Sequence, residues 1–444
     1  MKTGCFKNIL GKGRPIISKE LALLVLLTTI SAYPLPANQV HENIRFEPAA
    51  FDAFGINQVK TADPNLNGQN INLAVVSRSF SYADGKPQHD YKPYLGHKCF
   101  YNSMLQLHDD GGDFDGISPH STQVCSILFG RDSAGYTENT GNFIYEGILP
   151  QANAGVYEFW HYLSNNVFEN TSADLDIVSI SMGAEFPAWW TRGLEAMVQN
   201  DNLVILAAVG NGSENENSLL YPGASANIIG VGVAQSLYDP NSDLNSFPLA
   251  VAEYSSRGPC RDKRIKPDII APGNFLVADS NSSWEYTYSG DYSSFATPAA
   301  AGTAGLLIQK IKQNKLMQEK IGPNSLNCLI KAILMNSAIK LPYFHKGKLT
   351  SEDDHKMPLD FVQGAGLINA WPAFLTLEAG NFKPGLCQPL GWDINKLSSE
   401  FDYQNAYYFE VSDPGSQIIS ATLAWNKYYQ QEYPFEQLEH LDND

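Results

Sequence analysis

Short runs of apolar residues alternate with helical patterns between residues 71 and 338 of the 444-residue chain. Nearly continuous apolar runs are typical of parallel strands that are covered on both faces. The predicted strands are Ile71–Val76, Ala154–Phe159, Asp176–Ser181, Leu203–Ala208 and Ile228–Val233. The predicted helices are Thr122–Phe129, Thr191–Gln199, Thr297–Ile311, Leu326–Ala338 and Ala370–Leu377. This alternation predicts an α/β fold, a doubly wound and mainly parallel sheet with crossover helices.

The pattern changes near residue 400 to short alternating strands, predicted at Tyr407–Val411 and Gln417–Ala424 with Asp413-Pro414-Gly415 between them. Two strands bury too little apolar surface to be stable alone. We therefore expect residues 381–444 to form a partial β-rich C-terminal region. Either it docks on the main domain, or it belongs to a β-domain cut short at Asp444. The region contains no pairing of a nucleophile with a base, so we expect no catalytic group there.

The first 32 residues have the pattern of a secretory signal peptide. Five basic residues precede the apolar run Leu21–Ile30, and Ala32 supplies a small residue at the expected cleavage site. Ten apolar residues are too few to span a bilayer, and no later stretch approaches the necessary length. We predict a secreted or extracytoplasmic protein without a membrane span once the signal is removed. The alternative is a short tether that stays uncut.

Charge and cysteine content narrow the function classes. The chain has 30 basic and 47 acidic residues, of which five and one lie in the first 32, so the remainder carries a net charge of −21. Such a field repels phosphate backbones and argues against nucleic acid as a partner. After signal removal five cysteines remain, so at least one is unpaired. Their spacing supports neither a zinc site nor a thioredoxin-type motif, and no cofactor is predicted.

Polar groups follow the predicted strands at their carboxyl ends, where open α/β sheets place their functional residues. Ser77 follows the first strand, Ser181-Met182-Gly183 the third, and Gly210-Asn211-Gly212 the fourth. A further segment, Tyr292–Pro298, leads into a helix rich in small residues and contains Ser294. A helix N-terminus favours an oxyanion, because its N–H groups are free and its dipole is positive there. A lone serine at this place is more often a helix cap, and a lone histidine such as His120 is more often structural.

Several stretches that occur in the same order as in a known family favour a catalytic role for Ser294 and His120. Together these stretches resemble the subtilisin-like serine peptidases. Ser293-Ser294-Phe295-Ala296-Thr297-Pro298 resembles the nucleophile segment Gly-Thr-Ser-Met-Ala-Thr-Pro, and His120-Ser121-Thr122-Gln123-Val124 resembles His-Gly-Thr-His-Val. Ala207–Ser213 resembles the stretch with the oxyanion-hole asparagine, and Ser179–Gly183 the strand that pairs with substrate. Further signature stretches are similar at residues 254–259, 265–273 and 363–370. Motifs of this length and order predict a subtilisin-like catalytic domain at residues 61–380, after an N-terminal extension at 33–60.

The resemblance implies roles for individual residues. Ser294 would be the nucleophile and His120 its general base, with Asn211 donating to the oxyanion together with the Ser294 N–H. A peptide or protein substrate would add as a strand beside Ser181, Met182 and Gly183, and beside Ala208, Val209 and Gly210. No metal takes part in this chemistry.

The chain also departs from the family pattern. Ser77 stands at the position of the triad aspartate and brings no negative charge. Tyr292 and Ser121 replace glycines, and Ala299 replaces a histidine. The span from 33 to 60 is also too short for a folded inhibitory propeptide. Another acid could serve His120, and the candidates are Asp84, Asp90, Asp109, Asp110, Asp113 and Asp115. The last four resemble a calcium loop only loosely, and the spacing favours a solvated acidic loop over structural calcium.

Two functional readings remain. One is a secreted serine endopeptidase that works slowly, or with a substitute acid. The other is a catalytically weak or inactive pseudo-peptidase that binds peptides or a protein partner through the same cleft. Retention of His120, Asn211 and Ser294 favours the first reading, and a purely structural protein would need none of these residues.

Overall fold

The computed structural model describes most of the chain after its N-terminal segment. The described residues are 45–78, 82–83, 86–87, 90–111, 116–169, 174–212, 218–236, 249–344, 356–395, 404–410 and 419–438. The predicted signal peptide therefore lies outside them, as do Asp84, Asp113 and Asp115. Within the described part, no helix combines the length and the apolarity needed to cross a bilayer.

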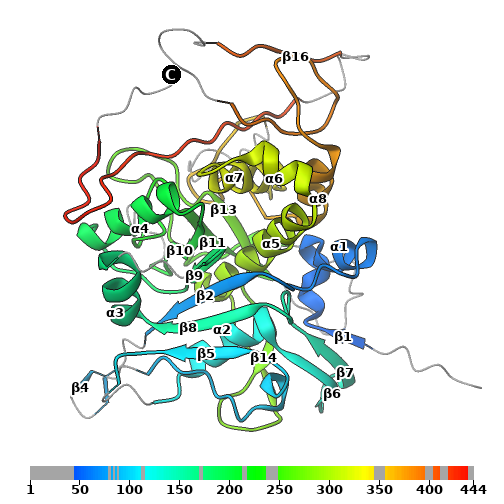
Figure 1. Ribbon diagram of the computed structural model, residues 1–444. Helices are drawn as coiled ribbons and strands as arrows, with labels where there is room; N and C mark the ends of the chain where they lie inside the picture. Colours follow the sequence, from blue (N-terminus) through cyan, green and yellow to red (C-terminus); the bar gives the residue numbers. More distant parts are fainter. Residues whose placement is uncertain are drawn as a thin grey trace, which may run out of the picture. The chain divides into compact units, whose positions relative to one another are not determined.

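A mainly parallel sheet forms the centre of the domain (Figure 1). Its strand order is β12-β11-β10-β9-β2-β8-β5, and β13 pairs in parallel with β11. Only the pair of β11 with β12 is antiparallel among these strands. The strands span Asn72–Ser77 (β2), Leu105–His108 (β5), Asn153–Glu158 (β8), Ile177–Ile180 (β9), Val204–Ala208 (β10), Ile229–Ser236 (β11), Leu249–Val251 (β12) and Ile269–Pro272 (β13).

All five predicted strands are present, with bounds shifted by one to three residues, and the α/β fold class is confirmed. The helices that match predictions are α2 (Pro119–Phe129), α4 (Trp189–Asn200), α5 (Ser293–Gln313), α7 (Leu326–Asn336) and α8 (Ala370–Ala379). Helix α5 begins four residues before the predicted start at Thr297, so it includes Ser294.

Shorter elements complete the described part. The helical ones are η1 (Ala49–Phe54), α1 (Ile56–Ala62), η2 (Lys98–Phe100), α3 (Phe159–Tyr162), the π-helix η3 (Leu163–Phe168) and α6 (Lys315–Ile321). The strands are β1 (Arg45–Glu47), β3 (Tyr82–Ala83), β4 (Lys86–Pro87), β6 (Arg131–Thr137), β7 (Gly141–Glu146), β14 (Leu276–Ala278), β15 (Tyr286–Tyr288), β16 (Gly385–Leu386) and β17 (Tyr407–Tyr408).

Strand β2 shows why its sequence is continuously apolar. Leu73 and Val75 face the core cluster that contains residues of α2 and α5, whereas Ala74 and Val76 face a second cluster that contains residues of α3, η3 and α4. Successive side chains of a strand point to opposite faces, so a sheet covered on both sides needs apolar residues at every position.

The C-terminal residues 419–438, which we call the C-terminal strap, dock on the main domain as an extended segment (red in Figure 1). The strand predicted at Gln417–Ala424 is wrong for the described residues 419–424, which join no sheet. Their hydrogen-bonding groups go elsewhere: Ser420 and Thr422 donate to Asn336 of α7. This segment is therefore attached to a helix side chain and not to a neighbouring strand. The alternation of apolar and polar residues in the sequence does not distinguish these two cases.

Buried contacts hold the rest of the strap. Lys427 and Asn227 exchange two hydrogen bonds of 2.7 and 2.8 Å, and the hydroxyl of Tyr429 donates to Glu195 of α4 at 2.9 Å. Tyr429 and Phe435 lie in the core cluster beside α4. Residues 427–435 of the strap thus dock on the domain.

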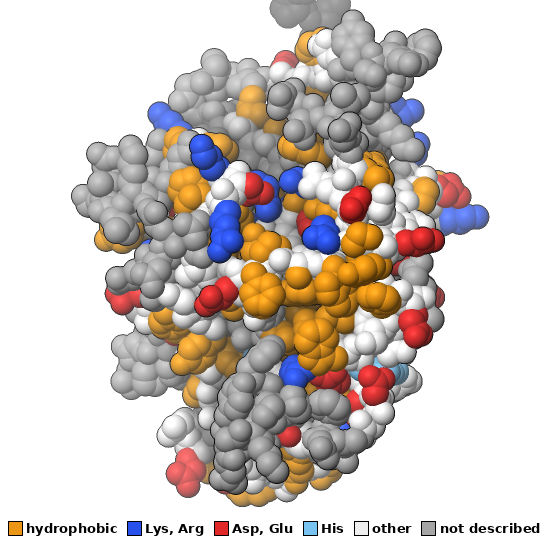
Figure 2. Space-filling view, turned by 90° about the vertical axis from the view of Figure 1, so that its left-hand side faces the viewer, with side chains coloured by type: hydrophobic (Ala, Val, Ile, Leu, Met, Phe, Trp, Pro, Cys, Tyr) orange, Lys and Arg blue, Asp and Glu red, His pale blue; other side chains and the backbone are white. Residues whose placement is uncertain are grey.

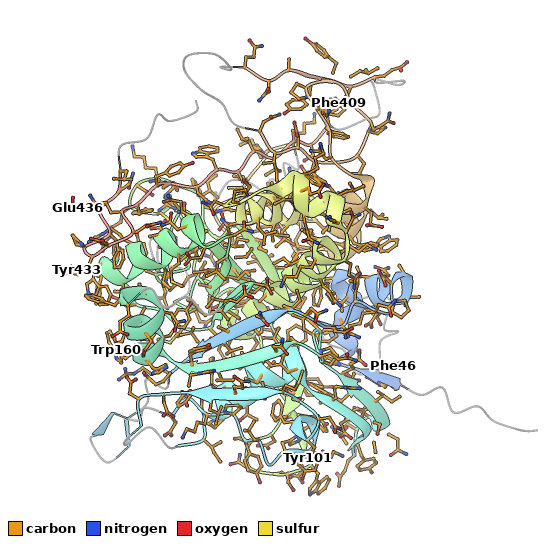
Figure 3. The ribbon with its side chains drawn as sticks, viewed as in Figure 1. Phe46, Tyr101, Trp160, Phe409, Tyr433 and Glu436 are labelled. Carbon is orange, nitrogen blue, oxygen red and sulfur yellow. The ribbon has the colours of Figure 1, made fainter. Side chains whose placement is uncertain are left out.

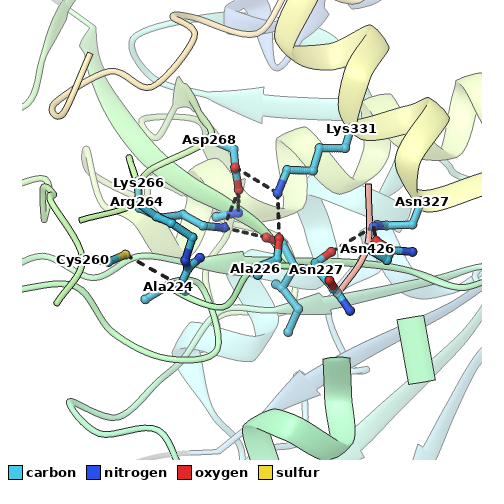
Figure 4. Close-up of polar contacts among 12 residues, drawn as sticks. Ala224, Ala226, Asn227, Cys260, Arg264, Lys266, Asp268, Asn327, Lys331 and Asn426 are labelled. Carbon is cyan, nitrogen blue, oxygen red and sulfur yellow. Dashed lines mark hydrogen bonds and ion pairs between the residues drawn. The ribbon is translucent and has the colours of Figure 1, made fainter. Parts of the chain in front are cut away.

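A buried ion network supports the loop before β11 (Figure 4). Asp268 accepts from Lys266 at 2.5 Å and lies 3.0 Å from the ammonium of Lys331. Both lysines also donate to backbone carbonyls of this loop, at Ile228 and Ala226. Burial lowers the pKa of Lys266 to about 8. Burial alone would raise the pKa of Asp268, but the two lysines hold it below its usual value.

Removing the carboxylate from this network should destabilise the fold strongly. We expect Asp268→Asn to lower the free energy of unfolding by about 3–5 kcal/mol, because it leaves buried cationic groups without their counter-charge. Urea denaturation at pH 7 measures this loss. The exposed pair Lys315–Glu319 supplies the control, since Glu319→Gln should change stability by less than about 0.5 kcal/mol. Equal effects of the two substitutions would contradict the assigned role of the network.

Candidate active site

The predicted site residues lie where the parallel strands end. Ser77 ends β2, Ser181 directly follows β9, and Asn211 comes shortly after β10. In Figure 1 the arrowheads of β2 and β8 point to the side of α3 and α4, which is the face turned to the viewer in Figure 2. Hydrogen bonds join two of these loops to the start of α5.

Ser294 is held at the start of α5 by two hydrogen bonds with one partner. Its carbonyl oxygen accepts from the Ser181 hydroxyl at 2.7 Å, and its own hydroxyl donates to the Ser181 carbonyl at 3.1 Å. The carbonyl is available because Pro298, four residues later in the helix, has no N–H to donate. The proline therefore creates an acceptor that ties the end of β9 to the nucleophile.

The structure places the two predicted oxyanion donors, the Asn211 amide and the Ser294 N–H, at the start of α5. The side-chain oxygen of Asn211 accepts from the Ser293 N–H at 2.8 Å, which leaves the amide NH₂ group to donate. No described group accepts from the Ser294 N–H, which is one of the free donors at a helix start. Asn211 is exposed, so its amide can meet a ligand from solvent, and Ser294 is half-buried. The start of α5 can thus stabilise a developing negative charge.

His120 lies in the first turn of α2, and it contacts the residue that follows Ser294. Its ring packs against Phe295, the residue after Ser294, with ring centroids 5.6 Å apart. Among the described residues, no hydrogen bond links His120 to Ser294 or to a carboxylate. Burial lowers the pKa of His120 to about 4, and no charge in the described part of the chain opposes that effect. The ring is therefore neutral at pH 7, as a general base must be.

The described hydrogen-bond partner of the Ser77 hydroxyl is Ser121, not His120. Ser77 is buried, and its hydroxyl forms a hydrogen bond of 2.5 Å with the hydroxyl of Ser121, which is also buried. Asp90, a candidate substitute acid, has its carboxylate against Gly116. Within the described part of the chain, no acid replaces the triad aspartate beside His120.

Two acids of the suspected calcium loop are bound by the protein itself. Asp109 accepts from the Tyr91 hydroxyl at 2.6 Å and lies 3.4 Å from the ammonium of Lys92. This hydrogen bond from Tyr91 holds the pKa of Asp109 below its usual value. Asp110 pairs with His161 at 2.6 Å. The described residues contain no group of three potential ligands that could hold a metal ion.

The two predicted substrate-binding segments differ in how much of their backbone is free. Val209 bonds to both Leu220 and Val231, and the Gly210 carbonyl accepts from Ser256, so this segment has little left for a peptide. Ala184 uses its N–H and C=O on Tyr221. Backbone N–H and C=O groups alternate in direction along an extended chain, so those of Gly183 point away from Tyr221. The backbone of Val209–Gly210 is therefore largely occupied by the protein itself, whereas no described group pairs with the N–H and C=O of Gly183.

An aromatic surface accompanies the site on the same side of the molecule. Phe168, Trp189 and Tyr433 contact one another with ring centroids 5.3 to 6.1 Å apart. Trp160, beside Arg78, and Tyr433 both project from this side in Figure 3, and Figure 2 shows a broad apolar area there. The sequence analysis missed this surface because its residues come from distant segments, one of them the C-terminal strap.

Comparisons with known proteins agree with this architecture. The profile described as "Subtilase family" matches residues 69–366. Serine protease AprX of Bacillus subtilis is 26% identical over 299 residues, covering 59% of this chain and 62% of AprX. The major intracellular serine protease of the same organism is 26% identical over 283 residues, covering 60% of this chain and 77% of that protein. The chain thus spans about three fifths of AprX, and only 22% of the similar pyrolysin of Pyrococcus furiosus.

A solved structure shows the same fold at low sequence identity. The PatG macrocyclase in complex with peptide has a TM-score of 0.51 and 14% identity, covering 75% of this chain and 99% of that one. The likeness concerns the fold alone.

The low pKa of His120 gives a prediction that needs no assay of activity. As the pH falls, the ring should stay neutral until the pH approaches about 4. An unperturbed histidine takes up its proton near pH 6.5. NMR titration of histidine-labelled protein checks this, with His120→Gln to assign the signal. Titration of His120 near pH 7 would show that a carboxylate stabilises the imidazolium after all.

Proposed function

Because the chain belongs to the subtilase family, we propose that it is a serine endopeptidase that hydrolyses peptide bonds through an acyl-enzyme on Ser294. The arrangement at the start of α5 carries this proposal. There the Ser294 hydroxyl, the free Ser294 N–H and the Asn211 amide lie together. A hydroxyl beside two oxyanion donors is what acyl transfer requires.

The mechanism needs one rearrangement. The Ser294 hydroxyl turns from the Ser181 carbonyl toward His120, which takes its proton as Ser294 attacks the scissile carbonyl. The oxyanion is then stabilised by the Ser294 N–H and Asn211, and His120 returns the proton to the leaving amine. The reverse sequence with water releases the acid product. No cofactor or metal is required at any step.

The missing carboxylate makes the reaction slow. No carboxylate among the described residues stabilises the imidazolium that forms when His120 takes the proton. In a subtilisin, a member of the same family, loss of the triad aspartate lowers kcat by about 3 × 10⁴, yet turnover stays above the uncatalysed rate. A slow but real peptidase is therefore the expected behaviour.

The substrate class follows from the backbone and the charge. An extended peptide pairs with Gly183, and an unstructured segment of a protein fits this mode best. The acidic net charge disfavours nucleic acid as a ligand. Residues 1–32 act as a signal peptide, which makes the working location extracytoplasmic.

A second candidate function is peptide binding without cleavage, as in a pseudo-peptidase. Its support is the hydrogen bond from the Ser294 hydroxyl to Ser181, which keeps the nucleophile away from its base. The neutral His120 without a charged partner fits this candidate too.

Hydrolysis of unfolded casein separates the two candidates. We expect slow release of peptides by the wild type and none by Ser294→Ala, because the nucleophile is gone. Ser293→Ala is the matched control: its buried hydroxyl has no described partner, and its backbone N–H still holds Asn211. It should keep most of the activity. Equal hydrolysis by wild type and Ser294→Ala would overturn the assignment of the nucleophile.

Asn211 should act on the transition state and little on substrate binding. We expect Asn211→Ala to lower kcat about 10²–10³-fold with a smaller change in KM, because one oxyanion donor is lost. Asn142→Ala, at an exposed position of β7, is the control. Steady-state kinetics on a fluorogenic peptide measure both variants. An increase in KM alone would instead assign Asn211 to ground-state binding.

A further inference from the structure

Two departures from the family pattern meet in space. Ser77, at the position of the triad acid, and Ser121, at the position of the glycine after the base, share a hydrogen bond of 2.5 Å. Both are almost completely buried, at 3% and 0% exposure. They come from the elements that support His120, the end of β2 and the first turn of α2. Substitutions 44 residues apart thus form one contact.

The backbone leaves Ser121 little freedom to move away. Ser118 caps α2 and accepts from the Ser121 N–H at 3.1 Å, and the next residue, Thr122, donates to the Ser118 carbonyl from both its N–H and its hydroxyl. The first turn of α2 is therefore held at three points. The backbone of Ser121 is therefore fixed in this turn, with its hydroxyl beside that of Ser77.

An aspartate at position 77 would need the space that Ser121 fills. An aspartate has its carboxyl carbon near the position of the serine hydroxyl, and its two oxygens lie about 1.2 Å from that carbon. Since the Ser77 and Ser121 hydroxyls are already 2.5 Å apart, a carboxylate oxygen turned toward Ser121 would come closer than the shortest hydrogen-bond distance of about 2.5 Å. A glycine at position 121 would remove the obstacle.

We propose that Ser121 is a positioning residue coupled to Ser77: it fills the space of a triad carboxylate, so that the pair, and not Ser77 alone, keeps His120 without an acid. This inference rests on the proposed function, since it assigns the pair a place in that site. It implies that the acid can be restored only by changing both residues together.

The test compares Ser77→Asp, Ser121→Gly and the double variant in the full chain. We expect the single Ser77→Asp variant to gain less than about tenfold in kcat/KM on casein. The double variant should gain about 10²–10⁴-fold, as the imidazolium acquires its carboxylate. The His120 pKa, read by NMR, should rise in the double variant only. The variant Ser77→Asn/Ser121→Gly has the same shape without charge and should show neither change.

The outcomes separate this inference from the proposed function. An equal gain by Ser77→Asp alone, or a rise in the His120 pKa in that variant, overturns the role of Ser121. If a fluorophosphonate labels Ser294 in the wild type but the double variant gains nothing, the inference fails and the peptidase assignment stands. If no variant hydrolyses casein, the NMR pKa decides the inference alone: a rise confined to the double variant supports it. A Ser77→Asp protein that unfolds while the double variant folds also supports it.

Discussion

The carbonyl oxygen of Ser294 has no helical donor, because Pro298 stands where that donor would be. The Ser181 hydroxyl donates to this carbonyl in place of the missing N–H, and the Ser294 hydroxyl donates back to the Ser181 carbonyl. A long buried helix is thereby locked to the end of a central strand at the point where a nucleophile is needed. The adjacent N–H groups follow from the same arrangement: one orients Asn211, and the other stays free for an oxyanion.

The base side of the site is built differently. His120 is placed by packing on Phe295 and by the capped first turn of α2, without a carboxylate among the described residues. Burial keeps the ring neutral, so it can accept a proton at any ordinary pH, but the charged form is costly. The two halves of the site thus differ in kind. The start of α5 presents the donors that we propose for the oxyanion, whereas His120 has no carboxylate partner among the described residues.

The fold was predictable because it depends on patterns within short segments. Leu73–Val76 reads as a strand covered on both faces, and the structure shows that packing. Ser294, His120 and Asn211 were predicted as site residues from local motifs for the same reason. The contact of Ser77 with Ser121, the capture of the Ser294 carbonyl and the free edge at Gly183 arise from chain segments far apart in sequence. The periodicity of apolar residues carries no information about these contacts. The four-residue spacing of Ser294 and Pro298, however, could have predicted that the Ser294 carbonyl has no helical donor.

We propose that Ser294 is a working nucleophile and that its base, His120, lacks a carboxylate partner. The rate at which a fluorophosphonate labels Ser294, followed by mass spectrometry between pH 3.5 and pH 8, tests both properties together. Labelling should stay level from neutral pH down to about pH 5 and decline only toward the His120 pKa of about 4. No labelling at any pH would contradict the nucleophile. A rate already halved near pH 7 would show that His120 has an acid partner.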